Sequence, residues 1–197
     1  KVVGKGWTTG AIKWVFKVND HYESHFDKVT GQPYKFVRDI YEGGYTKNRI
    51  VEFDHIKNKA LVNDLKTNTS SRVDIEKNIQ DLVSAYYYLR NNYNTATIKD
   101  GDIVELNIFF DSETFLFKLK YLGHETINTK FGKIKCIKFR PYVMAGRVFR
   151  EEESLTLWVS ADKNKVPIKI KADLQVGSLR ADLEAQKGLK YPFQIQL

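Results

Sequence analysis

The fold is decided by residues 22–40, which read YESHFDKVTGQPYKFVRDI. On either side of a turn-forming segment at residues 29–33, apolar or small side chains alternate with polar ones, as is typical of half-buried strands. The residues that share one side are Tyr22, Ser24, Phe26, Tyr34, Phe36 and Ile40. If Lys28 pairs with Tyr34, the opposed pairs are Phe26 with Phe36, Tyr22 with Ile40 and Asp27 with Lys35. This stretch therefore predicts an antiparallel hairpin with one buried side.

The same two-residue period recurs along most of the chain. Before the hairpin it indicates a strand over residues 12–18, in which Ile12, Trp14, Phe16 and Val18 share one face. After the hairpin we expect strands at residues 47–54, 59–66, 103–110, 115–122, 133–140, 146–150, 154–160, 165–174, 178–186 and 192–197. The sequence thus predicts about a dozen short antiparallel strands.

One segment has a different period. Between Val73 and Leu89, apolar residues recur at spacings of three and four, which fits an amphipathic helix of roughly 19 residues. Ser70 or Ser71 can cap its N-terminus, and the helix is expected to end near Asn92. We therefore expect one long helix over about residues 72–91.

Several strands carry apolar residues on both faces. Leu155, Leu157 and Val159 point to one face of their strand, whereas Trp158 points to the other and needs a cover. The helix is the obvious cover, and a sheet of a dozen strands tends to curl or to split into two layers. The predicted fold is therefore mainly β: a large antiparallel barrel or half-barrel of about a dozen strands, covered by one long amphipathic helix, in a single domain over residues 1–197.

Composition and charge exclude several classes of protein. The longest apolar runs, such as residues 82–89, are far shorter than the roughly 18 residues of a membrane-spanning helix, so we expect a chain that does not span a membrane. The net charge of +8 is enough to favour anionic partners, and it is equally compatible with a role in solubility. The basic residues form no consecutive block and lack interleaved exposed aromatic residues, so we expect no nucleic-acid partner. Because the chain begins at Lys1 rather than Met, we expect that a signal segment or N-terminal strands precede it in the natural protein.

No motif in the chain has the spacing that catalysis requires. A Gly-x-Ser-x-Gly elbow and a Gly-rich phosphate loop before a helix are both absent, and the single Cys136 lies between isoleucines as a buried thiol would. His21, Glu23, His25 and Asp27 alternate along one strand and could hold a metal ion. However, i and i+4 residues of a strand lie about 13 Å apart, which favours a solvated face instead. We therefore expect no catalytic residues, no cofactor and no metal site.

Several segments together resemble a family of exported bacterial envelope proteins known only as a domain of unknown function. The matching segments are FKVND at 16–20, RDIYEGGY at 38–45, SAYYYLR at 84–90, KFRP at 138–141, ESLTLWVS at 153–160 and VGS at 176–178. The resemblance covers roughly residues 12–189 and implies a signal-bearing protein of the Bacteroidetes type. It also implies a large antiparallel barrel called YmcC-like, similar to the half-barrels of lipoprotein carriers. It implies no activity and no catalytic residues.

Four residues are candidates for ligand binding: Arg38, Tyr45, Tyr86 and Trp158. Arg38 falls on the buried side of the hairpin, where its guanidinium needs acceptors from either a structural ion pair, for example with Glu42, or a bound ligand. Tyr86 is one of three consecutive tyrosines, of which a helix can bury at most two. Tyr45 closes the RDIYEGGY segment of the resemblance.

Strands that are apolar on both faces favour a binding protein over an enzyme. The expected function is that of a non-enzymatic protein of the periplasm or cell envelope that encloses a lipid or other amphipathic ligand beneath the helix. The alternative is a structural or assembly protein of the envelope with a filled interior. Such a protein would present a sheet edge or its basic strands over residues 118–140 to a protein or polysaccharide partner.

Overall fold

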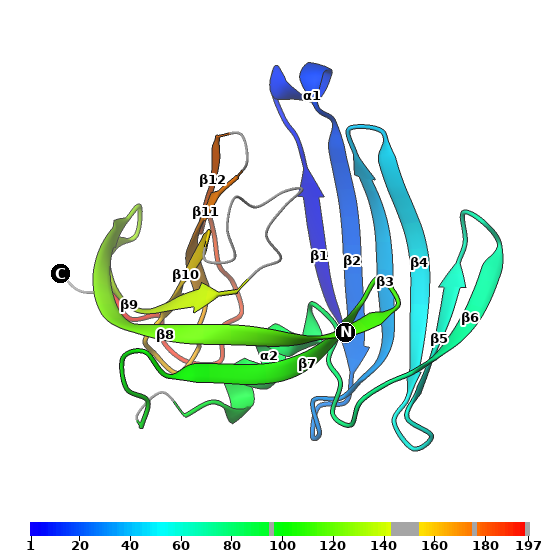
Figure 1. The fold of residues 1–197 in the computed structure, drawn as a ribbon. Coiled ribbons are helices and arrows are strands. Elements are labelled where there is room, and N and C mark those ends of the chain that lie inside the picture. The colour runs from blue at the N-terminus through cyan, green and yellow to red at the C-terminus, as the bar shows by residue number, and fades with distance from the viewer. Residues whose placement is uncertain (95–96, 143–153, 175–176, 196–197) are drawn as a thin grey trace. The chain divides into compact units, whose positions relative to one another are not determined.

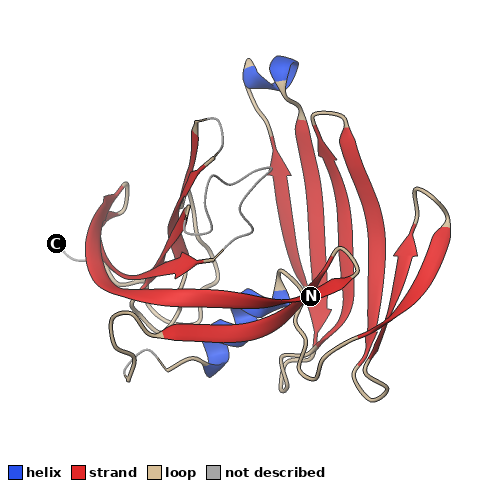
Figure 2. Ribbon diagram, in the orientation of Figure 1, coloured by secondary structure: helices blue, strands red, loops and turns tan. Residues whose placement is uncertain are grey.

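A computed structural model describes residues 1–94, 97–142, 154–174 and 177–195. The chain divides into two compact units. The first consists of Lys1–Tyr93 and Leu106–Leu116, and the second of Asn94–Glu105 and Phe117–Leu197. Almost all regular structure is strand (Figure 2), and the described part of the chain contains only two short helices, α1 and α2. The expectation of a mainly β protein is confirmed.

The first unit is built on a six-stranded antiparallel sheet (Figure 1) in which each strand pairs with the next one along the chain. Its strands are β1 (Val2–Trp7), β2 (Val18–Phe26), β3 (Pro33–Glu42), β4 (Tyr45–Asp54), β5 (Lys59–Asp64) and β6 (Thr69–Asp74). A helical turn, α1 (Ile12–Val15), joins β1 to β2. Since β1 and β6 pair with only one neighbour each, this sheet is open.

One face of the first sheet, called here the core face, carries the main apolar cluster of the unit. Phe36, Val51, Phe53, Ala60 and Val62 project from β3, β4 and β5 and are nearly fully buried. They are packed by residues from outside the sheet, namely Ile75, Ile79 and Phe109. The interior beside the first sheet is therefore filled by the chain's own side chains.

The second sheet also has six antiparallel strands, in the order β12-β11-β10-β9-β8-β7. Their bounds are β7 (Ile103–Phe110), β8 (Glu113–Thr129), β9 (Gly132–Pro141), β10 (Leu155–Ser160), β11 (Pro167–Asp173) and β12 (Ser178–Asp182). The hairpin end of β7 and β8, residues 106–116, belongs to the first unit. In the second unit, Ile127, Ile134, Cys136, Trp158 and Ile168 form a buried cluster that Phe193 and Leu183 cover in part.

The predicted long helix is wrong, because more than half of its segment is strand, turn or irregular structure rather than helix. Residues 69–74 form β6, and Asn78 has a positive φ of 58°, which a helix cannot accommodate. Gln80 then pairs with β7: its N–H donates to Asn107 O at 3.0 Å, and its carbonyl accepts from Phe109 N–H at 2.8 Å. Only α2 (Ser84–Asn92) is helical. The helix-like spacing of apolar residues has another cause. Val73 in β6, and Ile75 and Ile79 in the segment between β6 and α2, all pack against the apolar cluster of the first unit.

The helix cap also differs from the expected one. Asp81 Oδ1 accepts the N–H groups of Val83 and Ser84 at 2.8 and 2.7 Å, and Ser84 Oγ accepts Asp81 N–H at 2.9 Å. The other carboxylate oxygen accepts Ser24 Oγ–H at 2.5 Å, which ties the start of α2 to β2. Burial raises the pKa of the Asp81 carboxyl above its ordinary value, although these hydrogen bonds oppose the shift.

The predicted 22–40 hairpin is confirmed, but its register is shifted by two residues. Tyr22 pairs with Arg38 and Ser24 with Phe36, because the loop spans residues 27–32 with Asp27 bonded across it. A shift of two residues preserves the faces, so Phe36 and Ile40 are buried as predicted, whereas Tyr34, which was predicted on the buried side, is exposed. The strand expected over residues 12–18 is wrong: α1 lies there, and β2 begins at Val18. No strand forms over 192–195, and the strand expected at 146–150 lies outside the described residues.

The described strands form two open sheets rather than one closed barrel. The predicted number of about a dozen strands is confirmed, and the covering long helix is not. The expected single domain over residues 1–197 stays a prediction.

Candidate functional site

Of the four candidate ligand-binding residues, three belong to the first unit and one to the second. Arg38 lies in β3 opposite Arg49, and Tyr45 lies four residues before Arg49 in β4. Because side chains alternate along a strand, Arg38 and Tyr45 share the core face. Tyr86 lies in α2, and Trp158 lies in β10 of the second unit.

Arg38 meets the end of the β7–β8 hairpin. Its Nη1 donates to Asp111 Oδ1 at 2.6 Å. Arg49 Nη1 lies 3.5 Å and Lys47 Nζ lies 3.9 Å from the same carboxylate oxygen. Arg49 also donates through Nε to Asp64 Oδ2 at 2.8 Å. Three cations and two carboxylates thus form one group on the core face, called here the Arg38 cluster.

The guanidinium of Arg38 is buried and only partly satisfied. Burial alone would lower its pKa, but the hydrogen bond and the charge of Asp111 raise it above the ordinary value. Its Nε has no hydrogen-bond acceptor among the described residues, and its guanidinium carbon lies 4.4 Å from the centre of the Phe110 ring. The space between the surrounding side chains measures about 10 Å³, room for at most one water molecule.

The core face changes from cationic to apolar along its strands. The residues of β4 that share this face are, in order, Tyr45, Lys47, Arg49, Val51 and Phe53. Val51 and Phe53 are buried in the apolar cluster, whereas Lys47 and Arg49 belong to the Arg38 cluster. One strand thus carries a cationic end and an apolar end.

The three tyrosines of α2 point in different directions, as expected. Tyr87 packs on Phe26, with ring centres 5.4 Å apart, and Tyr88 lies against Gly31 in the β2–β3 loop. Tyr86 is half-buried, its ring lies 5.4 Å from that of Tyr87, and burial raises the pKa of its hydroxyl. A role of Tyr86 in ligand binding stays a prediction.

Trp158 is buried, as expected, although the long helix that was expected to cover it is absent from the described residues. Its Nε1 donates to Glu125 at 3.1 Å, and the ammonium groups of Lys138 and Lys169 lie 5.4 and 5.2 Å from its ring centre. The hydrogen bond from Trp158, followed by that from Lys138, holds the pKa of Glu125 below its ordinary value. These contacts account for the burial without the predicted long helix. A role of Trp158 in ligand binding stays a prediction.

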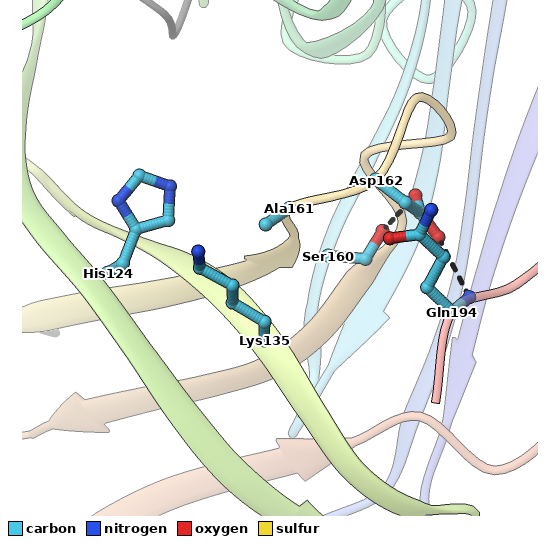
Figure 3. Close-up of a pocket in the computed structure, with 6 residues that line it drawn as sticks. All are labelled: His124, Lys135, Ser160, Ala161, Asp162 and Gln194. Carbon is cyan, nitrogen blue, oxygen red and sulfur yellow. Dashed lines mark hydrogen bonds between the residues drawn. The ribbon is translucent and has the colours of Figure 1, made fainter. Parts of the chain in front are cut away.

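The second unit contains a polar pocket of about 230 Å³ (Figure 3). Its lining residues are His124, Lys135, Ser160, Ala161, Asp162 and Gln194. In Figure 3 the hydroxyl of Ser160 is directed to Asp162, to which it donates at 2.8 Å, while His124 lies on the other side of the pocket. His124 Nδ1 is instead bonded to Tyr121 OH at 2.8 Å. The pocket therefore lacks the serine–histidine contact that activates a nucleophile.

The Ser160–Asp162 pair holds the C-terminal segment in place. Asp162 Oδ2 accepts Gln194 N–H at 3.3 Å, and Asn164 exchanges hydrogen bonds with the backbone of Tyr191 at 3.0 and 3.1 Å. Asp162 and Asn164 are both buried. The sequence predicted a turn here but gave no sign of this second role, since the partners lie about 30 positions away along the chain.

The alternating His21, Glu23 and His25 share one face of β2, as expected. Glu23 binds His25 at 2.5 Å, Lys1 at 3.0 Å and His21 at 3.4 Å. Within the described ranges, no group of three histidine, cysteine, aspartate or glutamate side chains is arranged to hold a metal ion. Nor is any helix of the described chain both long and apolar enough to cross a bilayer.

The fold places the chain among mainly β proteins built from antiparallel sheets. A solved structure supports this: a β-barrel-like protein of the domain of unknown function DUF1849 from Brucella abortus has 12% sequence identity and a TM-score of 0.56, over 86% of this chain and 73% of that one. At this identity the similarity shows the fold alone. The model of the DUF3108 family, described as a protein of unknown function, matches residues 1–184, so the chain belongs to that family. No curated protein matches the chain.

Proposed function

We propose that this chain is a non-enzymatic, exported protein of the bacterial cell envelope that binds an anionic amphipathic molecule on the core face of its first unit. The ligand would have an acyl chain or similar apolar part and an anionic headgroup. This proposal keeps the function expected from the sequence. It moves the binding site from beneath a long helix to the side of the sheet that carries Arg38 and Tyr45.

The Arg38 cluster is the observation that carries the proposal. The three cationic side chains of the cluster meet two carboxylates, Asp111 and Asp64, so the cations of the group outnumber its carboxylates by one. The buried Arg38 Nε has no acceptor among the described residues. An anion with several oxygens would satisfy these donors better than a single carboxylate does, since arginine pairs with such groups through two hydrogen bonds.

The end of the β7–β8 hairpin supports an amphipathic ligand. Phe109 packs in the apolar cluster, Phe110 lies over Arg38, and Asp111 provides the negative charge. This order of groups has the chemistry of an acyl chain followed by an anionic headgroup. Asp111 and Ser112 form the two-residue turn of this hairpin, with positive φ angles of 50° and 70°. A ligand of this kind would take the place of the hairpin end.

Native mass spectrometry and fatty-acid binding test this proposal. We expect the purified chain to carry lipid adducts and to bind oleate, and Arg49→Gln to weaken oleate binding by about tenfold, because a charge-assisted contact is lost. Arg72→Gln is the matched control, since Arg72 is exposed in β6. A clean apo mass together with equal oleate binding by both variants would contradict the proposal.

Export and envelope location form part of the proposal and rest on the segments that resemble exported envelope proteins, including the YmcC-like architecture and the Bacteroidetes-type origin. The assignment as non-enzymatic is supported by the polar pocket, in which Ser160 bonds to Asp162. Fractionation of cells that express the full-length protein would test the location. A purely cytosolic protein would contradict it.

A second candidate is a structural or assembly protein of the envelope. It is favoured by the filled interior beside the first sheet, where the space at the Arg38 cluster measures about 10 Å³. The exposed Lys133 and Lys135 on β9 would then face a protein or polysaccharide partner. A clean apo mass in native mass spectrometry would favour this candidate.

A further inference from the structure

The connection between β1 and β2 exposes an unusual number of large apolar side chains. Trp14 is 84% exposed, Val15 88%, Trp7 66% and Phe16 50%. Trp14 and Val15 lie in α1, and Trp7 and Phe16 lie before and after it in the chain. Figure 1 shows α1 at the end of the first sheet, beyond the ends of β1 and β2. Trp7, Trp14, Val15 and Phe16 are called here the aromatic tip. Contiguous exposed apolar groups of this kind mark an interaction surface rather than ordinary protein surface.

The aromatic tip is held rigidly by its base. Thr8 N–H donates to Val18 O at 3.2 Å, and Val18 N–H donates to Thr8 Oγ1 at 3.0 Å. Gly43 N–H donates to Lys17 O at 2.8 Å, and the ring of Phe16 lies so close to Gly43 that a Cβ there would collide with it. Both ends of the connection that carries the aromatic tip are thus anchored to the sheet.

Positive charge accompanies the apolar side chains. Residues 8–17 contain Lys13 and Lys17 and no acidic residue. Lys13 Nζ lies 5.6 Å from the centre of the Trp14 ring. A groove of about 550 Å³ runs between Trp7, Trp14 and the two lysines. At the opposite end of the sheet, the loop between β2 and β3 contains one acidic residue, Asp27.

We propose that the aromatic tip docks on the surface of a lipid bilayer that contains anionic headgroups. Tryptophan and phenylalanine side chains favour the boundary between headgroups and acyl chains, and lysines beside them are attracted to anionic lipids. A projecting tip suits a bilayer because a bilayer needs no shape complementarity. The absence of acidic residues in this connection matches a negatively charged surface. This inference is independent of the ligand proposed for the core face.

Vesicle co-sedimentation of the 197-residue chain tests the proposal. We expect binding to vesicles of phosphatidylcholine mixed with phosphatidylglycerol, and much weaker binding to phosphatidylcholine alone. Trp14→Ser with Val15→Ser should lower the partition coefficient about tenfold. The matched control is Val29→Ser with Ile56→Ser, because these residues are each 94% exposed in loops at the opposite end of the same sheet.

A second pair of variants tests the charge. Lys13→Gln with Lys17→Gln should weaken binding to the anionic vesicles by about tenfold, whereas Lys28→Gln with Lys57→Gln, in the opposite loops, should leave it unchanged. Brominated lipid should also quench the fluorescence of Trp7 and Trp14 but not that of the buried Trp158.

Three results would overturn the proposal. The first is no binding to anionic vesicles, or equal loss of binding in the tip variants and the opposite-end controls. The second is self-association in light scattering that Trp14→Ser with Val15→Ser abolishes, which would make the aromatic tip an interface between copies of the chain. The third is submicromolar binding of oligothymidylate that requires Trp14, which would make it a stacking platform for single-stranded nucleic acid.

Discussion

Three carboxylates hold together segments that are far apart along the chain. Asp81 joins α2 to Ser24 of β2, and Asp111 joins the β7–β8 hairpin to Arg38 of β3. Asp162 binds the backbone of the C-terminal segment at Gln194. Buried or partly buried carboxylates are costly unless such partners surround them. We therefore expect each of them to fix one segment of the chain in its place.

Glu23 gives rise to a pH-dependent prediction. The hydrogen bond with His25, followed by that with Lys1, lowers its pKa from 4.5 to about 2. A carboxylate with a lowered pKa stabilises the folded state above its unfolded pKa, and this contribution is lost as the pH falls through the folded pKa. Glu23→Gln should therefore lower the melting temperature at pH values above 4.5, and the difference from the wild type should shrink between pH 4.5 and 2.

Melting temperatures measured by circular dichroism across this pH range provide the check. Glu76→Gln, at an exposed position, is the control and should give a small and constant difference. A difference for Glu23→Gln that does not change with pH would contradict the prediction.

Trp158 gives rise to a prediction about stability. Since it is buried and donates a hydrogen bond to Glu125, Trp158→Ala should lower the free energy of unfolding by roughly 3–5 kcal/mol. Trp158→Phe keeps an aromatic ring and loses the hydrogen bond, so it should cost about 1 kcal/mol. Urea unfolding followed by circular dichroism measures both values. A neutral Trp158→Ala would show that the ring does not pack as the structure places it.

At the scale of elements, α2 illustrates how a short helix is stabilised by its neighbours. Its nine residues are too few for a stable isolated helix. It depends on the cap from Asp81 and on the packing of Tyr87 against Phe26 and of Tyr88 against Gly31. Contacts with β2 and with the β2–β3 loop therefore hold α2 in its position.

Removal of the cap should loosen this element. Asp81→Ala leaves Ser24 Oγ and two backbone N–H groups without their acceptor, so the free energy of unfolding should fall by roughly 2–3 kcal/mol. Asp81→Asn should cost less, because an amide oxygen still accepts and the cost of a buried charge is removed. Urea unfolding of both variants tests this, with the exposed Asp74→Ala as control. Equal losses for Asp81→Asn and Asp81→Ala would contradict it.

At the scale of the whole molecule, most of the net charge of +8 belongs to the second unit. Many of the cations are paired, as Lys118 is with Glu105 and Lys138 with Glu125. The sequence argument against nucleic acid included the lack of exposed aromatic residues beside lysines, and the aromatic tip corrects this point. The other ground remains, since no consecutive block of basic residues exists.

We therefore still predict only weak nucleic-acid binding. Two lysines at the tip neutralise few phosphates, whereas tight binding commonly involves roughly 6–10 phosphate contacts. The dissociation constant for oligothymidylate should exceed about 1 µM at physiological salt and should rise steeply with salt concentration. Fluorescence anisotropy at several salt concentrations measures it. Submicromolar binding at physiological salt would contradict the prediction.

The sequence by itself determined most of the strands, although β1 and β6 were not expected as strands. The strand at residues 103–110 and the core positions Phe36 and Ile40 follow from a local two-residue period. The shifted hairpin kept Phe36 and Ile40 on the buried face, because its register moved by two residues. The family resemblance likewise follows from local segments.

Only the tertiary structure decided the length of the helix, the partner of Arg38 and the exposure of Trp14. The 73–79 segment looked helical because its apolar residues all pack against the same apolar cluster. Val73 does so from β6, and Ile75 and Ile79 do so from the segment that follows β6. Arg38 could not be paired with Asp111 from the sequence, since the two residues are 73 positions apart. Trp14 had the pattern of a strand, but the antiparallel pairing of β1 with β2 required a connection there. Periodicity reports the environment of a residue within its own segment, whereas these features depend on contacts between distant segments.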